Sequence, residues 1–96
     1  MARIKSLKKD IDFLMNELIT DCQLFIITRP EQNSPEAEKI INQAVELWNQ
    51  LYERTNNPDG KHDRKLVRQH YKSIEKDLLV QTHEMFAQIS ALAAKD

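Results

Sequence analysis

The chain has 96 residues, of which 41% are hydrophobic and 30% are charged, and its formal net charge at pH 7 is −1. This length is that of a single domain, residues 1–96, and the balanced charge excludes a strong overall field that would attract nucleic acid or a membrane. Gly60 is the only glycine, so the chain cannot form a glycine-rich phosphate loop or a nucleotide-binding turn.

Hydropathy and cysteine content indicate where the protein resides. The longest apolar run, residues 24–27, is far too short to span a bilayer or to form the core of a signal peptide. The single cysteine, Cys22, excludes an internal disulfide and suits a reducing compartment. We therefore expect a cytoplasmic protein with no membrane partner.

A first helix is predicted over about residues 3–28. Its apolar residues recur every three or four positions, which is typical of an amphipathic helix. They are Ile4, Leu7, Ile11, Leu14, Leu18, Cys22 and Phe25, with Met15, Ile19 and Ile26 widening the stripe. Pro30 ends the helix, because proline disfavours the helical conformation at the residue before it.

A second helix is predicted over about residues 35–56. Ser34 is a good N-cap and Pro35 suits the first helical position. The acids Glu36 and Glu38 favour the positive end of the helix dipole. The predicted apolar face consists of Ala37, Ile40, Ile41, Ala44, Val45, Trp48, Leu51 and Tyr52. Trp48, in the middle of this face, is expected in the core.

A third helix is predicted over about residues 63–93. The segment Asn57-Pro58-Asp59-Gly60 before it is typical of a type I turn. Asp63 is the expected N-cap. The apolar stripe that follows comprises Val67, Tyr71, Ile74, Leu78, Thr82, Met85, Ile89 and Leu92.

The three stripes together predict the fold. Each stripe is wider than the seam of a two-stranded coiled coil, so each helix must contact two others. The connections between the helices are short, and no strand-like alternation interrupts the helical periodicity. The sequence therefore predicts an all-α protein, an up-down-up three-helix bundle.

Two segments carry a resemblance: residues 3–11, RIKSLKKDI, and residues 56–61, NNPDGK. With these segments the chain resembles a family of short, uncharacterised bacterial all-helical proteins, and the likeness covers most of its length. The resemblance implies a bacterial origin. Because we know of no activity for the family, it implies no functional residues.

Residues that could carry chemistry do not occur at the spacing that chemistry requires. His83-Glu84 begins like the zinc motif His-Glu-x-x-His, but Ala87 stands where the second histidine would be. Asp59 and Asp63 are better explained as a turn residue and a helix cap than as metal ligands. We therefore expect no catalytic residue, no metal site and no cofactor, and a protein that is not an enzyme.

Basic residues gather at one end of the predicted bundle, which we call the basic pole. In an up-down-up bundle the first and third helices begin at the same end, where the second helix finishes. The basic pole comprises Arg3, Lys5, Lys8, Lys9, Arg54, Lys61, Arg64, Lys65, Arg68 and Lys72. Cations at helix N-termini oppose the helix dipole, so helix stability does not explain them. They are candidates for binding an anion.

Several apolar residues lie off the core stripes. On the first helix they point roughly opposite to Ile11 and Leu18, and on the third they flank the stripe. The candidate self-association residues are Phe13, Thr20, Leu24, Ile27, Leu79 and Phe86. A set of exposed apolar residues that share a face can mark an interface.

These two features support two hypotheses about function. The leading one is a small non-enzymatic interaction module that acts through protein–protein contacts and self-associates as a homodimer or binds another protein. The alternative is a nucleic-acid-associated protein whose basic pole binds phosphates without sequence preference, which would make binding sensitive to salt.

Overall fold

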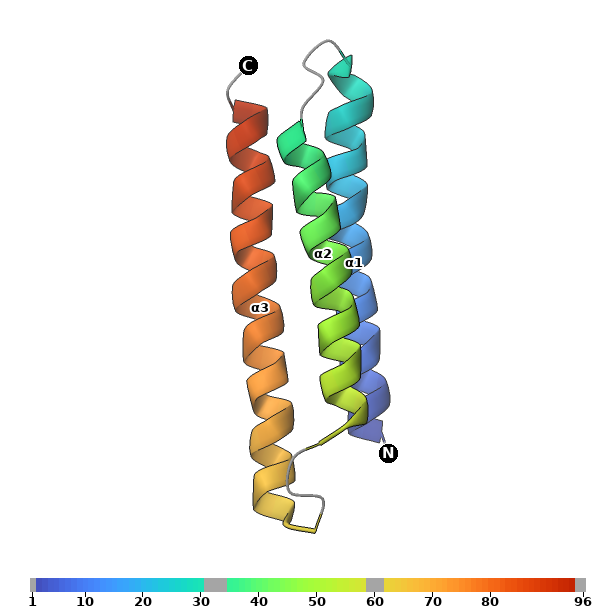
Figure 1. Cartoon of the computed structure of the whole chain (residues 1–96), viewed down its shortest axis with the longest axis vertical. Coiled ribbons are helices and arrows are strands. Elements are labelled where there is room, and N and C mark those ends of the chain that lie inside the picture. Colours follow the sequence, from blue (N-terminus) through green and yellow to red (C-terminus); the bar gives the residue numbers. More distant parts are fainter. Residues whose placement is uncertain (1, 31–34, 59–61, 95–96) are drawn as a thin grey trace.

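The computed structural model describes residues 2–30, 35–58 and 62–94. Within these ranges the chain folds as three helices, α1 (Ala2–Thr28), α2 (Pro35–Asn56) and α3 (Arg64–Ala94), and it contains no strand. Helix α2 runs antiparallel to α1 and α3 (Figure 1). The predicted up-down-up three-helix bundle is therefore confirmed, and the predicted helix ends agree with the observed ones to within about one residue.

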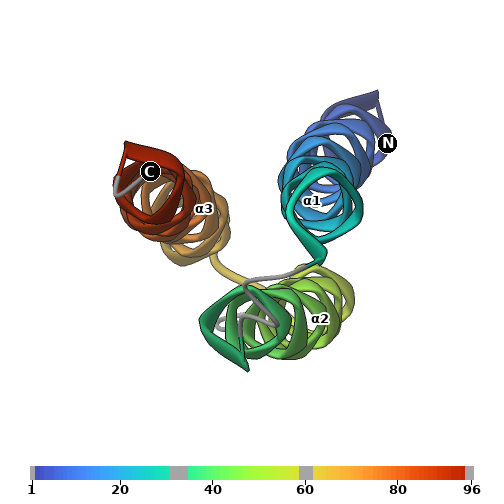
Figure 2. The ribbon, with the colours of Figure 1, turned by 90° about the horizontal axis from the view of Figure 1, so that it is seen from above.

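The helices form a rod whose Cα extents are 54 × 17 × 17 Å. Seen along the rod, α2 lies at the apex of a V and α1 and α3 form its two arms (Figure 2). Helix α1 makes its most extensive contact with α2, whereas α3 contacts its two neighbours less extensively. The parallel pair α1 and α3 therefore has a side that faces away from α2.

One hydrophobic core runs along the rod and draws on all three helices. It contains Leu7, Ile11, Met15, Leu18, Cys22 and Phe25 from α1, Ala37, Ile40, Ala44, Leu47 and Leu51 from α2, and Tyr71, Ile74, Leu78 and Ile89 from α3. The stripes predicted for the first and third helices supply the residues that these helices bury. Burying a large aliphatic side chain gains roughly 1.5–3 kcal/mol, so this core is the main source of stability.

The predicted apolar face of α2 is displaced from the observed one. Leu47 and Thr55 are buried although the prediction omitted them, whereas Val45 is 43% exposed and Trp48 is only half-buried. The reason is that α2 must face α1 and α3 at once, which centres its buried stripe on the line through Ala44, Leu47 and Leu51. The buried hydroxyl of Thr55 donates to the carbonyl oxygen of Leu51 at 2.7 Å, so it is satisfied within its own helix.

Polar contacts set the register between α1 and α2. Asp12 Oδ1 accepts hydrogen bonds from Trp48 Nε1 at 3.0 Å and from Tyr52 Oη at 2.6 Å. Lys8 Nζ lies 5.5 Å from the centre of the Tyr52 ring, where a cation–π attraction adds to the contact. The hydrogen bond to Asp12 raises the pKa of Tyr52, because the carboxylate accepts the phenol proton and opposes a second negative charge.

The end of α2 is held by side chains from α3. His70 donates from Nε2 to the carbonyl oxygen of Arg54 at 2.6 Å, and Tyr71 Oη donates to that of Thr55 at 3.2 Å. These carbonyls belong to the last turn of α2, which has no helical partner for them. The Arg54 guanidinium in turn lies 2.7 Å from the Asp77 carboxylate. Together these contacts fix where α3 lies against α2.

The side chain of Asp63 caps the start of α3. Asp63 Oδ1 accepts hydrogen bonds from the backbone N–H groups of Lys65 at 2.9 Å and Leu66 at 3.4 Å, which confirms Asp63 as the N-cap of α3. Ser34 and the second half of the predicted turn, residues 59–60, lie outside the described residues.

The burial of Leu47 and the exposure of Val45 on α2 lead to a direct prediction. Leu47→Ala should lower the free energy of unfolding by about 2–4 kcal/mol, because it opens a cavity in the core. Val45→Ala should lower it by less than about 0.5 kcal/mol, because Val45 is largely in water. Urea unfolding of both variants measures the difference. Equal losses for the two variants would contradict the observed burial.

The contact around Asp12 makes a second prediction. Asp12→Ala leaves the Trp48 and Tyr52 donors without their acceptor and should cost about 1–3 kcal/mol of unfolding free energy. Asp10→Ala, which removes an exposed carboxylate from the same helix, is the matched control and should cost less than about 0.5 kcal/mol.

The same variant changes how Tyr52 titrates. Its raised pKa means that the contact stabilises the fold below the ordinary phenol pKa of about 10 and is lost as pH rises through the folded-state pKa. Ultraviolet absorbance of phenolate should show Tyr52 ionising at lower pH in Asp12→Ala than in the wild type. An unchanged titration curve would mean that Asp12 does not hold the phenol proton.

Candidate interaction surface on helices α1 and α3

The side of α1 and α3 that faces away from α2 carries exposed apolar side chains. Phe13 is 63% exposed, Leu24 53%, Ile27 71% and Leu79 62%. Phe86 is half-buried and packs against the edge of the core, and Thr20 is exposed. We call this side the α1–α3 face.

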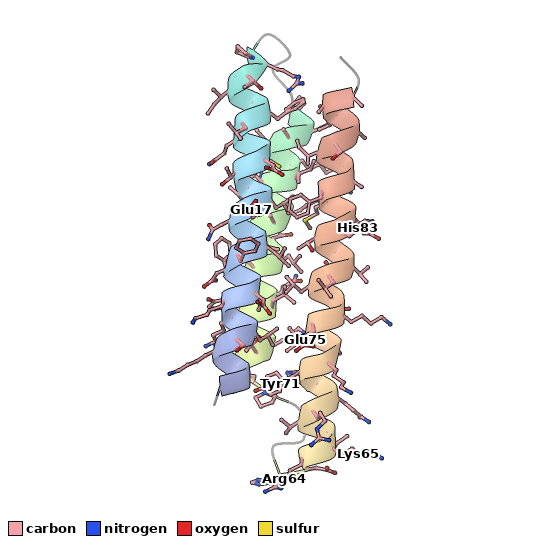
Figure 3. The ribbon with its side chains drawn as sticks, turned by 180° about the vertical axis from the view of Figure 1, so that it is seen from behind. Glu17, Arg64, Lys65, Tyr71, Glu75 and His83 are labelled. Atoms are coloured by element: carbon pink, nitrogen blue, oxygen red, sulfur yellow. The ribbon has the colours of Figure 1, made fainter. Side chains whose placement is uncertain are left out.

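The α1–α3 face is hollowed into two grooves. The lower groove, nearer the N-terminal ends of α1 and α3, has a volume of about 400 Å³. It is lined by Leu7, Asp10, Phe13 and Leu14 from α1 and by Glu75, Leu78 and Leu79 from α3. The upper one, of about 250 Å³, is lined by Asp21, Leu24, Phe25, Thr28 and Arg29 from α1 and by Ile89, Ser90 and Ala93 from α3. Figure 3 views the face with α2 behind it and labels Glu17 on α1 and Glu75 on α3.

The structure places three of the six predicted self-association residues beside the grooves of the α1–α3 face. Phe13 and Leu79, from different helices, line the same groove, and Leu24 lines the next groove along the face. Thr20 and Ile27 line neither groove, because their helical phase turns them further from α3. Phe86 also lines neither groove; it lies two turns beyond Leu79 on the same side of α3 and packs against the core. The face therefore centres on Phe13, Leu24 and Leu79.

Two further grooves lie on the α2–α3 side. One, of about 340 Å³, is lined by Glu36, Lys39, Ile40, Gln43, Gln88, Ala91 and Leu92. The other has a volume of about 360 Å³, and polar side chains dominate its lining. They are Gln43, Glu46, Gln50, Gln81, Glu84 and Gln88, with Leu47 and Met85 beneath. The remaining large exposed apolar residues, Val45, Leu66 and Val80, line neither groove of the α1–α3 face. Ile27 lines neither groove either, so among the described residues three of the seven large exposed apolar side chains, Phe13, Leu24 and Leu79, lie beside the grooves of the α1–α3 face.

The residues of the basic pole divide into two groups. Lys8 is half-buried over the Tyr52 ring, and Arg54 is paired with Asp77, so both act within the fold. The other described cations are exposed; these are Lys5, Lys9, Arg64, Lys65, Arg68 and Lys72. The side chain of Arg3 and the whole of Lys61 lie outside the described residues. The acids Asp10, Asp63 and Glu75 flank these cations in the sequence and reduce the net charge of this end.

The described part of the chain shows neither a reactive thiol nor a cluster of possible metal ligands. Cys22 is buried, and burial raises the pKa of its thiol to about 11, so it is held as an unreactive thiol at neutral pH. Among the described residues, no three His, Cys, Asp or Glu side chains come close enough to hold a metal ion. No helix within the described ranges is long and apolar enough to cross a membrane.

The groove floor was not recognised from the sequence. Leu7, Leu14 and Leu78 belong to the predicted core stripes, and they line the groove only because α1 and α3 run side by side. The signal that could have identified them is an exposed apolar residue directly beside a stripe residue on each helix: Phe13 precedes Leu14, and Leu79 follows Leu78.

Comparison with known proteins found no matching family model, no similar curated protein and no similar solved structure. The resemblance to a bacterial family therefore remains a prediction.

Proposed function

We propose that this chain is a small non-enzymatic interaction module that binds a helical protein surface through its α1–α3 face. The observation that carries the proposal is the exposure of Phe13, Leu24 and Leu79 beside two grooves on one side of the bundle. Single exposed apolar residues are ordinary on protein surfaces, but a set that shares one face is typical of an interface.

The energy available from the face suits a reversible contact. Covering a large apolar side chain that is about half exposed gains roughly 1–2 kcal/mol, so Phe13, Leu24 and Leu79 together supply several kcal/mol. Association costs of similar size oppose this gain. Binding should therefore depend strongly on each of these residues.

The shape of the face favours a helix as the bound element. Helices α1 and α3 run parallel, so partner helices that run in the opposite direction across them would extend the alternation of the bundle. An amphipathic partner helix presents apolar residues three or four apart to such a face. Such a partner would cover Phe13 and Leu79 together.

The basic pole supports the nucleic-acid alternative less well. Two of its cations act within the fold, and acids lie between the others. The indole of Trp48 and the phenol of Tyr52 are bonded to Asp12, so these rings are held within the α1–α2 contact rather than presented for stacking on bases. We therefore favour a protein partner and treat nucleic acid as an outcome of the test.

The test compares two neighbouring residues on α3. A tagged chain is used to capture partners from a lysate that also contains an untagged copy, with and without nuclease. Leu79→Glu should reduce the captured protein about tenfold or more, because it places a charge in the apolar face. Val80→Glu is the matched control: Val80 is 48% exposed but lines neither groove of the α1–α3 face, so capture should be unchanged.

Two results would contradict the proposal. One is equal capture by both variants, which would place the interaction elsewhere on the bundle. The other is capture that nuclease abolishes, which would favour the nucleic-acid alternative. Thermal unfolding of both variants checks that they remain folded.

A further inference from the structure

We infer that the partner of the α1–α3 face is a second copy of this chain, laid antiparallel so that each face covers the other about a two-fold axis. This inference rests on the proposed function, since it names what the face binds. Three observations carry it: the spacing of the apolar residues, the distribution of charge along the face and the area available.

The apolar residues are spaced symmetrically about one level of the rod. Phe13 and Leu24 are the exposed apolar residues that line the grooves from α1, and the midpoint between them falls between Leu18 and Ile19. On α3, Leu79 is exposed and lines the lower groove, whereas Phe86 is half-buried and lines neither groove. Phe86 is seven residues after Leu79 and therefore lies on the same side of the helix, and the midpoint of the two falls between residues 82 and 83.

These two midpoints lie at the same height. Leu14 and Leu78 line the lower groove together, and Phe25 and Ile89 line the upper groove together. Since each residue adds about 1.5 Å along a helix, a step of four residues from Leu14 and from Leu78 reaches the same level on both helices. That level is the one between the paired apolar residues.

A two-fold axis at this level matches apolar residues with apolar residues. It runs across the face, perpendicular to the helices, and sets α1 against α1 of the second copy and α3 against α3. Phe13 of one copy then meets Leu24 of the other, and Leu79 meets Phe86. Such an interface is isologous, because the same patch serves both copies.

The charge along the face favours the antiparallel arrangement over the parallel one. Cations outnumber acids toward the lower end of the two helices. The exposed cations are Lys5 and Lys9 on α1 and Arg68, Lys72 and Lys76 on α3, against Asp10 and Glu75 in the lower groove. A parallel copy would set these cations against one another, and like charges in contact oppose association. An antiparallel copy puts the two cationic ends at opposite ends of the assembly. It also opposes the dipoles of α1 and α3 to those of the second copy.

The area is sufficient for a reversible dimer. The stretch that overlaps about the axis is roughly 20 residues, or about 30 Å of helix, and two helices are about 20 Å wide. Each copy therefore covers roughly 600 Å² of the other, or about 1,200 Å² in total. This is the lower limit for a specific interface.

Cross-linking tests the arrangement. In a Cys22→Ala background, cysteines are placed at positions 13, 17 and 24 of α1 and treated with a short thiol cross-linker at concentrations where sedimentation shows the dimer. Glu17→Cys lies next to the axis and should cross-link to itself. Phe13→Cys and Leu24→Cys should each link poorly alone, and their mixture should link at least about tenfold more.

The failure of the inference and that of the proposed function are distinguishable. A purified chain that sediments as a monomer up to the millimolar range would overturn the second copy as the partner, while lysate capture would still report on the face. A dimer in which Phe13→Cys links to Leu79→Cys, and not to Leu24→Cys, would overturn the antiparallel arrangement. Leu24→Glu should weaken the dimer about 100-fold or more, because the change acts twice in a symmetric interface.

Discussion

The position of α2 between α1 and α3 is the constraint from which the rest of the structure follows. Asp12 binds Trp48 and Tyr52 across the α1–α2 contact, and His70 and Tyr71 hold the last carbonyls of α2 against α3. With α2 antiparallel to both neighbours, α1 and α3 have to run in the same direction. They then present the same side of the bundle to solvent, and that side is covered by no other element of the described chain (Figure 2).

This arrangement distinguishes residues that act within the fold from residues that are exposed for binding, although the sequence groups them together. Lys8 and Arg54 read as members of the basic pole, yet the fold uses them to pack on Tyr52 and to pair with Asp77. Phe13 and Ile27 were both predicted as self-association residues, yet only Phe13, with Leu79 from α3, lines the lower groove. A buried core stabilises the rod, and the residues one position beyond it are left for binding.

The sequence predicts the helices better than it predicts the surface between them. Periodicity and the breaks at Pro30 and Pro58 are local signals, and they predicted the helix ends closely. The face of α2 depends on how two other helices divide it, which explains why Val45 was expected inside and Leu47 was overlooked. The grooves depend on the height of α3 beside α1, which the contacts at His70 and Tyr71 help to set and which no local pattern encodes.

Nuclear magnetic resonance spectra recorded at increasing protein concentration test most directly the central claim, that this chain associates through its α1–α3 face. As the concentration rises, we predict that the signals of Phe13, Leu24, Leu79 and Phe86 shift together, while those of Val45 and Val80 stay in place. A spectrum that does not change with concentration would contradict self-association. Shifts that gather on the outer side of α2 would contradict the choice of face.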